Sequence, residues 1–429
     1  MKKFLALILA LVMALSLVAC GGGTTTDDKT PNDQTPSDAD GAKVKVGFIT
    51  LHDENSTYDL NFINGAKEAI AALGLTEDDY ILKTNVPEGQ ECYEAAVDMV
   101  DKGCNIIFAD SFGHEPYMIQ AAQENPDVQF CHSTGTRAHT EGLANYHNAF
   151  ASIYEGRYLA GIAAGLKLNA MIEAGEIKAE EAKMGYVGAF TYAEVVSGYT
   201  SFFLGARSVC PSVTMDVTFT GSWYDEALEK EGAQKLIDGG CKLISQHADS
   251  LGAPTACENA KVPNVSYNGS TKEAGPNTYI ISSRINWAPY YQYAIQCVID
   301  GKAIDADWTG TLATGSVVLT ELNTDVAAAG TQEAIDAAIA KLESGELHVF
   351  DCATFTTKAD DTMNPFKVDF LKVDADGHIT SYLADVDTDE AYTGDTEVVE
   401  NGYFAESAKR SAPYFDLQID GINLLNTAM

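Results

Sequence analysis

Apolar residues in the first part of the chain alternate between short unbroken runs and longer stretches with helical spacing. The runs at 44–51, 80–82, 105–109 and 128–132 are apolar on both faces, which is typical of strands in a covered parallel sheet. The stretches between them, at 62–73, 95–102 and 116–125, carry apolar residues every three or four positions. This alternation predicts strand–helix–strand crossovers and an open parallel sheet in an α/β fold.

The same alternation returns in the second part of the chain, together with an internal repeat. Strands are expected at 184–188, 214–219 and 243–247, and helices at 195–208 and 226–238. Residues 100–107 (VDKGCNII) match residues 237–244 (IDGGCKLI), and a similar turn follows each copy: DSFG at 110–113 and DSLG at 249–252. The repeat predicts two similar α/β lobes.

Each repeat places an Asp-Ser pair just past the carboxyl end of a central strand: Asp110 and Ser111, then Asp249 and Ser250. Ligands of open α/β sheets bind outside these strand ends. Two lobes that face one another would therefore form a cleft with one pair on each wall. The alternative is that both pairs only cap the helices that follow, because Asp and Ser are good N-caps.

Aromatic and polar residues gather at other predicted strand ends and loops. The aromatic candidates are Tyr58, Phe112, Trp223 and Trp287, and the polar candidates are Asn145, Asp249 and Asn268. Flat apolar walls with a few directed polar groups suit a planar heterocycle. Packing between the lobes is the alternative, and we favour it for Tyr291 and Trp308.

The N-terminus has the pattern of an export signal. A basic start at 1–3 precedes a 16-residue run at 4–19 that is interrupted only by Ser16 and is too short to span a bilayer. The run ends in Leu-Val-Ala before Cys20, which resembles the bacterial lipoprotein signal, in which this cysteine is acylated. An ordinary signal peptide with an incidental cysteine is the alternative. We expect a signal peptide at 1–19, a lipid-anchored disordered tether at 20–42, and a location on the extracytoplasmic face of the cell membrane.

Composition narrows the range of partners. With 62 acidic and 27 basic side chains the formal charge is -35, which argues against nucleic acid as a partner. The eight cysteines after Cys20 form no CxxC pair and no zinc pattern, so mostly free, buried thiols are favoured, although one disulfide is compatible. The sequence contains no nucleophile elbow, HExxH or phosphate loop, and we expect no catalytic residue, metal or cofactor. Residues 374–377 (DADG) hint at a calcium loop but fit a β-turn better.

Six segments together carry a resemblance to a known family. They are 154–161 (YEGRYLAG), 198–206 (GYTSFFLGA), 222–225 (SWYD), 246–250 (QHADS), 286–291 (NWAPYY) and 344–347 (SGEL). The chain resembles the basic membrane protein family of solute-binding lipoproteins, which is the purine-nucleoside-receptor-like group of ABC importers. The resemblance covers about 43–350 and, more loosely, 414–421.

The resemblance implies a type I periplasmic-binding-protein fold with two Rossmann-like lobes and hinge crossovers. The first lobe would comprise 43–152 and about 285–312, and the second 153–284 and about 313–350. Hinges are expected near 149–155, 281–287 and Leu312. Residues 351–429 would form an extension packed on the lobes.

The resemblance also implies a ligand, which is a purine nucleoside or a free nucleobase held between the lobes and passed to an ABC permease. Tyr58 would stack on the base beside Ser111 and Phe112, and Trp223 and Asp249 would contact it from the second lobe. The expected contact residues are Tyr58, Asp110, Ser111, Phe112, Asn145, Trp223, Asp249, Asn268 and Trp287.

Several alternatives remain at this stage. The first loop reads STYDLN at 56–61 in place of the nucleoside branch's Asp-x-Ser-Phe-Asn pattern, which leaves ribose recognition open. We expect a monomer that is not an enzyme. A sensory receptor of the same fold, a binding protein for another small solute such as a sugar, and an exported nucleosidase are the competing interpretations.

Overall fold

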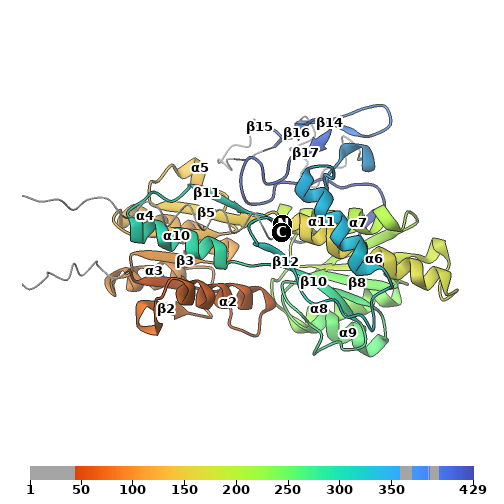
Figure 1. Cartoon of the computed structure of the whole chain (residues 1–429), viewed down its shortest axis with the longest axis horizontal. Helices are drawn as coiled ribbons and strands as arrows, with labels where there is room; N and C mark the ends of the chain where they lie inside the picture. Colours follow the sequence, from red (N-terminus) through yellow and green to blue (C-terminus); the bar gives the residue numbers. More distant parts are fainter. Residues whose placement is uncertain (1–43, 358–369, 385, 387–395) are drawn as a thin grey trace, which may run out of the picture. The chain divides into compact units, whose positions relative to one another are not determined.

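The computed structural model describes residues 44–357, 370–384, 386 and 396–429. The expected signal peptide, Cys20 and the tether lie outside the described residues. Lys43–Met429 form one compact unit, and its described residues contain both the sheets and the candidate site. It contains two large sheets with helices on both faces (Figure 1).

The first sheet is parallel throughout, with strand order β11-β5-β4-β3-β1-β2. Its strands are β1 (Val46–Ile49), β2 (Tyr80–Lys83), β3 (Ile106–Ala109), β4 (Gln129–Ser133), β5 (Tyr146–Ala151) and β11 (Asp307–Gly310). Helices α2 (Thr57–Ala72) and α10 (Ala288–Asp300) pack together over one core, and α3 (Gln90–Asp101) and α4 (Glu115–Glu124) over another. The short α5 (Ala138–Glu141), η1 (Glu77–Asp79) and η2 (Phe112–His114) complete this first lobe.

The second sheet has the order β12-β10-β9-β8-β6-β7-β18. Its strands are β6 (Lys183–Gly188), β7 (Thr214–Phe219), β8 (Leu243–His247), β9 (Asn264–Tyr267), β10 (Tyr279–Ile285), β12 (Val317–Leu319) and β18 (Ile422–Leu424). Its helices are α6 (Ile153–Glu173), α7 (Ala193–Val209), α8 (Glu226–Asp238), α9 (Gly252–Ala260) and α11 (Thr331–Ser344), with η3 (Ala179–Glu181). Helices α8 and α9 pack together over one core, whereas α6, α7 and α11 belong to the other. These elements form the second lobe.

The two sheets repeat one topology, which confirms the α/β fold and the internal repeat. Strands β2-β1-β3-β4-β5-β11 of the first sheet correspond in order to β7-β6-β8-β9-β10-β12 of the second. One difference is that β12 runs antiparallel to β10, whereas β11 is parallel to β5. The other difference is β18, which adds a parallel strand beside β7.

The chain passes between the sheets three times, from β5 to α6, from β10 to α10 and from β11 to β12. These passages fall where the hinges are expected, and they are joined to one another. The backbone N–H of Ser152 donates to the carbonyl of Gly310 at 2.8 Å, and that of Asn286 donates to Ser316 at 2.7 Å. A Cβ on Gly310 would lie 2.4 Å from the Cβ of Ser316, so the close approach of the crossing segments requires glycine there.

Helices α6 and α7 contact each other through their backbones. A Cβ on Gly161 would lie 2.1 Å from the carbonyl oxygen of Phe202, and a Cβ on Gly205 would lie 2.0 Å from that of Tyr158. Segments 154–161 and 198–206, on which the family resemblance partly rests, include these contacts. Glycine is needed at both positions because no side chain fits between the helices.

The described part of the C-terminal region packs on the second lobe. It contributes η4 (Cys352–Thr354), β13 (Leu371–Val373), β14 (Ile379–Ala384), β15 (Thr396–Glu397), β16 (Val399–Glu400) and β17 (Tyr403–Phe404). Tyr382, Phe404 and Phe415 belong to the same core as α6 and α7. Residues 374–377 form a turn between β13 and β14, as expected, in which the carboxylate of Asp374 accepts from two backbone N–H groups and Gly377 has φ 92°.

The eight cysteines after Cys20 are all free and buried, in agreement with the composition argument. Within the described ranges, no helix has the length and apolar character needed to cross a membrane. Across the same residues, no group of three or more His, Cys, Asp or Glu side chains is arranged to hold a metal ion.

Candidate functional site

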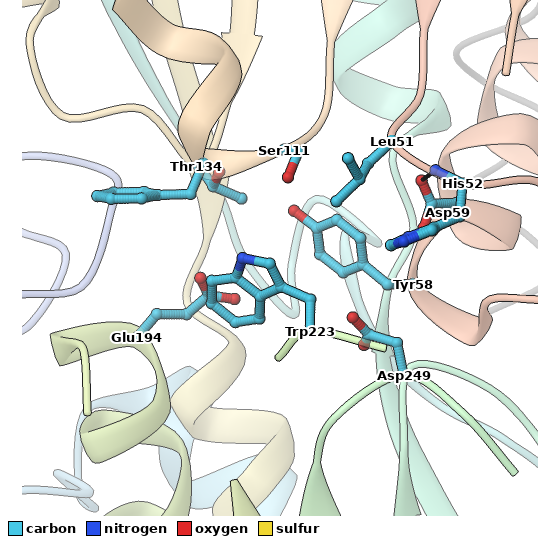
Figure 2. Close-up of a pocket in the computed structure, with 10 residues that line it drawn as sticks. Leu51, His52, Tyr58, Asp59, Ser111, Thr134, Glu194, Trp223 and Asp249 are labelled. Carbon is cyan, nitrogen blue, oxygen red and sulfur yellow. Dashed lines mark hydrogen bonds and ion pairs between the residues drawn. The ribbon is translucent and has the colours of Figure 1, made fainter. Parts of the chain in front are cut away.

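A cavity lies between the two lobes (Figure 2). The first lobe lines it with residues that follow the carboxyl ends of β1, β3 and β4. The second lobe contributes residues from the segments after β6, β7 and β8. The lining residues are Leu51, His52, Tyr58, Asp59, Ser111, Phe112, Thr134, Glu194, Trp223 and Asp249.

Tyr58 provides the aromatic wall of the first lobe. It lies in the first turn of α2, and its hydroxyl donates to the carbonyl of Asp110 at 2.7 Å. Its ring contacts Phe62 with centroids 4.8 Å apart, and Phe62 stacks on Trp287 at 4.4 Å and 21°. The predicted residue Trp287 therefore supports Tyr58 from behind, 1% exposed, and does not line the cavity.

Trp223 provides the aromatic wall of the second lobe. It lies in the loop between β7 and α8, and its carbonyl accepts the backbone N–H of Asp249 at 3.0 Å. Phe190 and Tyr192 hold its ring, with centroid distances of 5.1 and 6.1 Å. Figure 2 shows the indole of Trp223 beside the ring of Tyr58 at the cavity, with Asp249 below Tyr58.

The lobes contact each other around the cavity. Both the backbone N–H and the hydroxyl of Thr57 donate to the carbonyl of Asp249, at 3.0 and 3.2 Å, and the side-chain amide of Asn61 donates to the carbonyl of Asn268 at 2.5 Å. Ring contacts join His52 to Tyr224 and Phe112 to Tyr192, each with centroids 5.4 Å apart. The cavity is therefore closed by direct contacts between the lobes.

The lining includes three carboxyl groups and no lysine or arginine. Burial raises the pKa of Asp249 well above its usual value, and the nearby charge of Asp59 adds to this shift. Burial also acts to raise the pKa of Asp59, but hydrogen bonds from His52 and Ser56 outweigh it and leave that pKa below its usual value. Because a negatively charged ligand would be repelled here, the cavity suits a neutral or cationic solute.

Five of the nine predicted contact residues line the cavity: Tyr58, Ser111, Phe112, Trp223 and Asp249. Asp110 lies one layer behind, where its carboxylate accepts the N–H of Leu51 at 3.1 Å. Burial raises the pKa of Asp110 well above its usual value. Asn268 also lies in the second layer, and its side-chain amide donates to the carboxyl group of Asp249 at 3.2 Å.

Asn145 is placed away from the cavity. Its side-chain amide donates to three carbonyls, those of Ala122, Asn125 and Val128, at 3.0, 3.1 and 2.9 Å. The residue directly precedes β5, at the amino end of the strand, whereas the cavity lies past the carboxyl ends. Its position corrects the prediction of a ligand contact and gives Asn145 a role in joining the end of α4 to β5.

One member of each repeated Asp-Ser pair reaches the cavity, Ser111 in the first lobe and Asp249 in the second. The capping interpretation holds in part. The hydroxyl of Ser250 accepts the N–H of Gly252 at the start of α9, at 3.1 Å. The hydroxyl of Ser111 instead donates to the carboxylate of Glu88 at 2.6 Å.

Five lining residues were not among the predicted contacts: Leu51, His52, Asp59, Thr134 and Glu194. The rule that places ligands past strand ends could have indicated Thr134, which directly follows β4 and has φ 75°. Leu51 and His52 follow β1 in the same way. Asp59 and Glu194 lie in the first turns of α2 and α7. The helical spacing of apolar residues from which these helices were predicted does not extend over these turns.

The C-terminal segment holds the wall of the second lobe in place. The side chain of Asn426 accepts the backbone N–H of Phe219 at 2.8 Å and donates to its carbonyl at 2.9 Å. The N–H of Thr191 donates to the carbonyl of Ala428 at 2.7 Å. These contacts fix the two loops that carry Trp223 and Tyr192.

We predict that Asn426→Ala weakens solute binding by roughly three- to tenfold, because a lost hydrogen bond is worth about 1 kcal/mol and the loop of Trp223 loosens. Isothermal titration calorimetry measures this change. The matched control is Asn423→Ala, whose side chain donates to Asp216 on β7 outside the cavity lining. Equal affinities of the two variants would contradict the prediction.

The fold and the cavity between the lobes define a two-lobed solute-binding protein. The family described as "ABC transporter substrate-binding protein PnrA-like" matches residues 48–346, and the chain belongs to this family. A purine-binding protein of Brucella abortus is 30% identical over 72% of this chain and 83% of its own length.

Two further similarities broaden this comparison. A Haloferax volcanii protein, named for glucose binding in an ABC transporter, is 34% identical over 60% of this chain and 62% of its own length. A solved solute-binding protein of an ABC transporter system from Aeropyrum pernix superimposes with a TM-score of 0.60 at 18% identity, covering 76% of this chain and 95% of that one, and supports the fold.

Proposed function

We propose that the protein binds a purine in the cavity between its lobes, anchored by lipid at Cys20 on the extracytoplasmic face of the membrane, and delivers it to an ABC permease. Ligand exchange requires the lobes to separate at the three crossing segments. The ligand then favours the closed state because it contacts both walls at once.

The pair of aromatic walls is the observation that carries this proposal. Tyr58 and Trp223 come from different lobes and line one cavity, and each ring is held by further aromatic side chains. Flat rings stack favourably on nucleobases, at about 1–3 kcal/mol per base. A solute that contacts both rings can bind fully only when the lobes are closed.

The polar groups and the small free space of the closed cavity support a free nucleobase. The absence of lysine and arginine among the ten lining residues disfavours phosphate-bearing nucleotides. The carboxyl group of Asp249, whose pKa is raised by burial, can accept from the edge of a base and, when protonated, can also donate to it. Direct contacts between the lobes close the cavity and leave little free space in it, which favours a base over the larger nucleoside.

A thermal-shift screen followed by calorimetry tests the proposal. We expect the midpoint to rise with adenine, guanine or hypoxanthine, to rise less with inosine, and to stay unchanged with D-glucose and amino acids. A rise confined to glucose would contradict the purine assignment and favour the sugar alternative. Release of free base from inosine would contradict a binding role and favour a nucleosidase.

A further inference from the structure

The buried arginine Arg157 of the second lobe has no carboxylate partner. Its side chain is 0% exposed and donates to the carbonyl of Ser266 at 3.0 Å, the hydroxyl of Tyr186 at 3.1 Å and the hydroxyl of Ser245 at 2.7 Å. Within the described residues, no carboxylate oxygen lies within 4.0 Å of it. Three rings face its guanidinium, those of Tyr186, Phe202 and Tyr267. Burying a charge without a counter-charge costs free energy. This cost indicates that the positive charge of Arg157 has a functional role.

A chain of polar groups leads from Arg157 to the cavity. The hydroxyl of Tyr186 lies 3.4 Å from Nδ1 of His247, and Nε2 of His247 lies 3.5 Å from Oε1 of Glu194. Burial lowers the pKa of His247, so its imidazole is neutral and carries one proton. Because the oxygen of Tyr186 accepts from Arg157, its own O–H donates to Nδ1, and the imidazole proton then lies on Nε2 facing Glu194.

The packing around His247 fixes this orientation. A Cβ on Gly198 would lie 2.5 Å from Nδ1 of His247, so α7 needs glycine to admit the ring. The ring of Tyr267 lies on another side, with centroids 4.2 Å apart. Gly198 is one helical turn after Glu194 on α7, and the same helix therefore positions both the imidazole and the carboxylate.

Glu194 ends this chain inside the cavity. Its side chain is 13% exposed and lines the cavity, and Figure 2 shows its carboxylate beside Trp223. Oε1 faces His247, whereas Oε2 has no hydrogen-bond partner among the described residues. The cavity thus presents an acceptor in Glu194 and, apart from it, a carboxyl group in Asp249.

We propose that Glu194 selects ligands that direct an N–H donor at it, and that Arg157, Tyr186 and His247 form a relay that positions its carboxylate. The inference rests on the proposed function and narrows the ligand to a base with an N–H donor on its substituted edge. Adenine, guanine and hypoxanthine carry such a donor. Unsubstituted purine keeps only its imidazole N–H.

Calorimetric titration with these four bases tests the acceptor. We expect the wild type to bind at least one of adenine, guanine and hypoxanthine tenfold or more tightly than purine, and Glu194→Gln to lose that preference. The matched control is Glu333→Gln, a first-turn glutamate of α11 that is exposed and outside the cavity, which should keep it. A wild type without the preference, or a Glu194→Gln variant that retains it, would overturn the inference while purine binding stands.

The same titrations separate this inference from the purine proposal. If the wild type binds D-glucose and no base, the purine proposal fails. Weaker glucose binding by Glu194→Gln would then support an acceptor role of Glu194 toward an O–H donor. Unchanged glucose binding by this variant would overturn the acceptor role. Binding of none of these probes by the wild type overturns both proposals.

Tyr186→Phe tests the relay, because it removes only the hydroxyl between Arg157 and His247. We expect the preference to fall several-fold, whereas Tyr199→Phe, whose buried hydroxyl has no partner within the described residues, should leave it unchanged. If Tyr186→Phe does not fold, Glu194→Asp serves instead, because it keeps the charge and withdraws it from His247. A retained preference in the variant used would overturn the positioning role.

Discussion

Replacing Trp223 with alanine should weaken binding of the purine base by about 1–3 kcal/mol, or roughly five- to 150-fold in dissociation constant. In the proposed complex the indole supplies the stacking surface of the second lobe, and Phe190 and Tyr192 hold it at the cavity. Without it the ligand contacts one aromatic wall, so it gains less from closure of the lobes. Isothermal titration calorimetry at one temperature and salt concentration measures the loss.

The matched control for this variant is Trp308→Ala in the first lobe. Trp308 packs against Tyr290 and Tyr293, with centroids 5.2 and 6.5 Å apart, and does not line the cavity. We expect this control to lose thermal stability and to keep its affinity for the base. Equal affinity of the Trp223 variant and the wild type for the base would contradict the prediction that Trp223 contacts the ligand.

Replacing Glu155 with glutamine should stabilise the protein at alkaline pH. Glu155 lies in the first turn of α6, just past the first crossing segment, and its Oε2 is buried without a partner among the described residues. Burial raises the pKa of this carboxyl from 4.5 to about 7. A hydrogen bond from the backbone N–H of Leu312 acts in the opposite direction but is the weaker effect. Ionisation of the carboxyl therefore opposes folding.

The sign of the pH dependence follows from this raised pKa. Below pH 4.5 the carboxyl is protonated in both the folded and unfolded states, so it adds no pH dependence. Between pH 4.5 and about 7 the unfolded chain ionises while the folded state keeps the proton, so stability falls as pH rises and then levels off. At pH 8 the glutamine variant should exceed the wild type by up to about 3 kcal/mol, and at pH 4 the gain should vanish.

Urea denaturation at pH 4, 6 and 8 measures this difference. Glu173→Gln is the matched control, since Glu173 is the exposed last residue of the same helix. We expect the control to follow the wild-type profile. A constant offset between Glu155→Gln and the wild type at all three pH values would contradict the explanation.

The strands and most helices could be predicted from the sequence because their apolar pattern is uninterrupted. Helix α8 and strand β8 begin and end where the pattern predicts. Helix α2 was predicted to start at 62 but begins at Thr57, and α7 was predicted from 195 but begins at Ala193. The first turns that the prediction omitted carry polar residues that line the cavity, Asp59 and Glu194. These polar residues interrupt the apolar pattern, so the pattern could not indicate the first turns or the two residues in them.

The site itself could be predicted only in part, because a sequence does not tell a loop residue at a cavity from one in a core. Tyr58 and Trp287 are both aromatic residues at element ends, yet only Tyr58 lines the cavity, with Trp287 stacked two rings behind it. Asn145 follows the same polar pattern as Asp249, but it lies at the amino end of its strand. Strand direction and packing depth decided these cases.

A crystal structure of the protein with a bound purine base tests the central claim most directly. We predict the base between the two lobes, with its ring stacked on both Tyr58 and Trp223 at centroid distances of about 4.5–7 Å. Its polar edge should contact Asp249 or Glu194. A base bound outside this cavity, or one held by a single lobe with the other aromatic ring apart from it, would contradict the account.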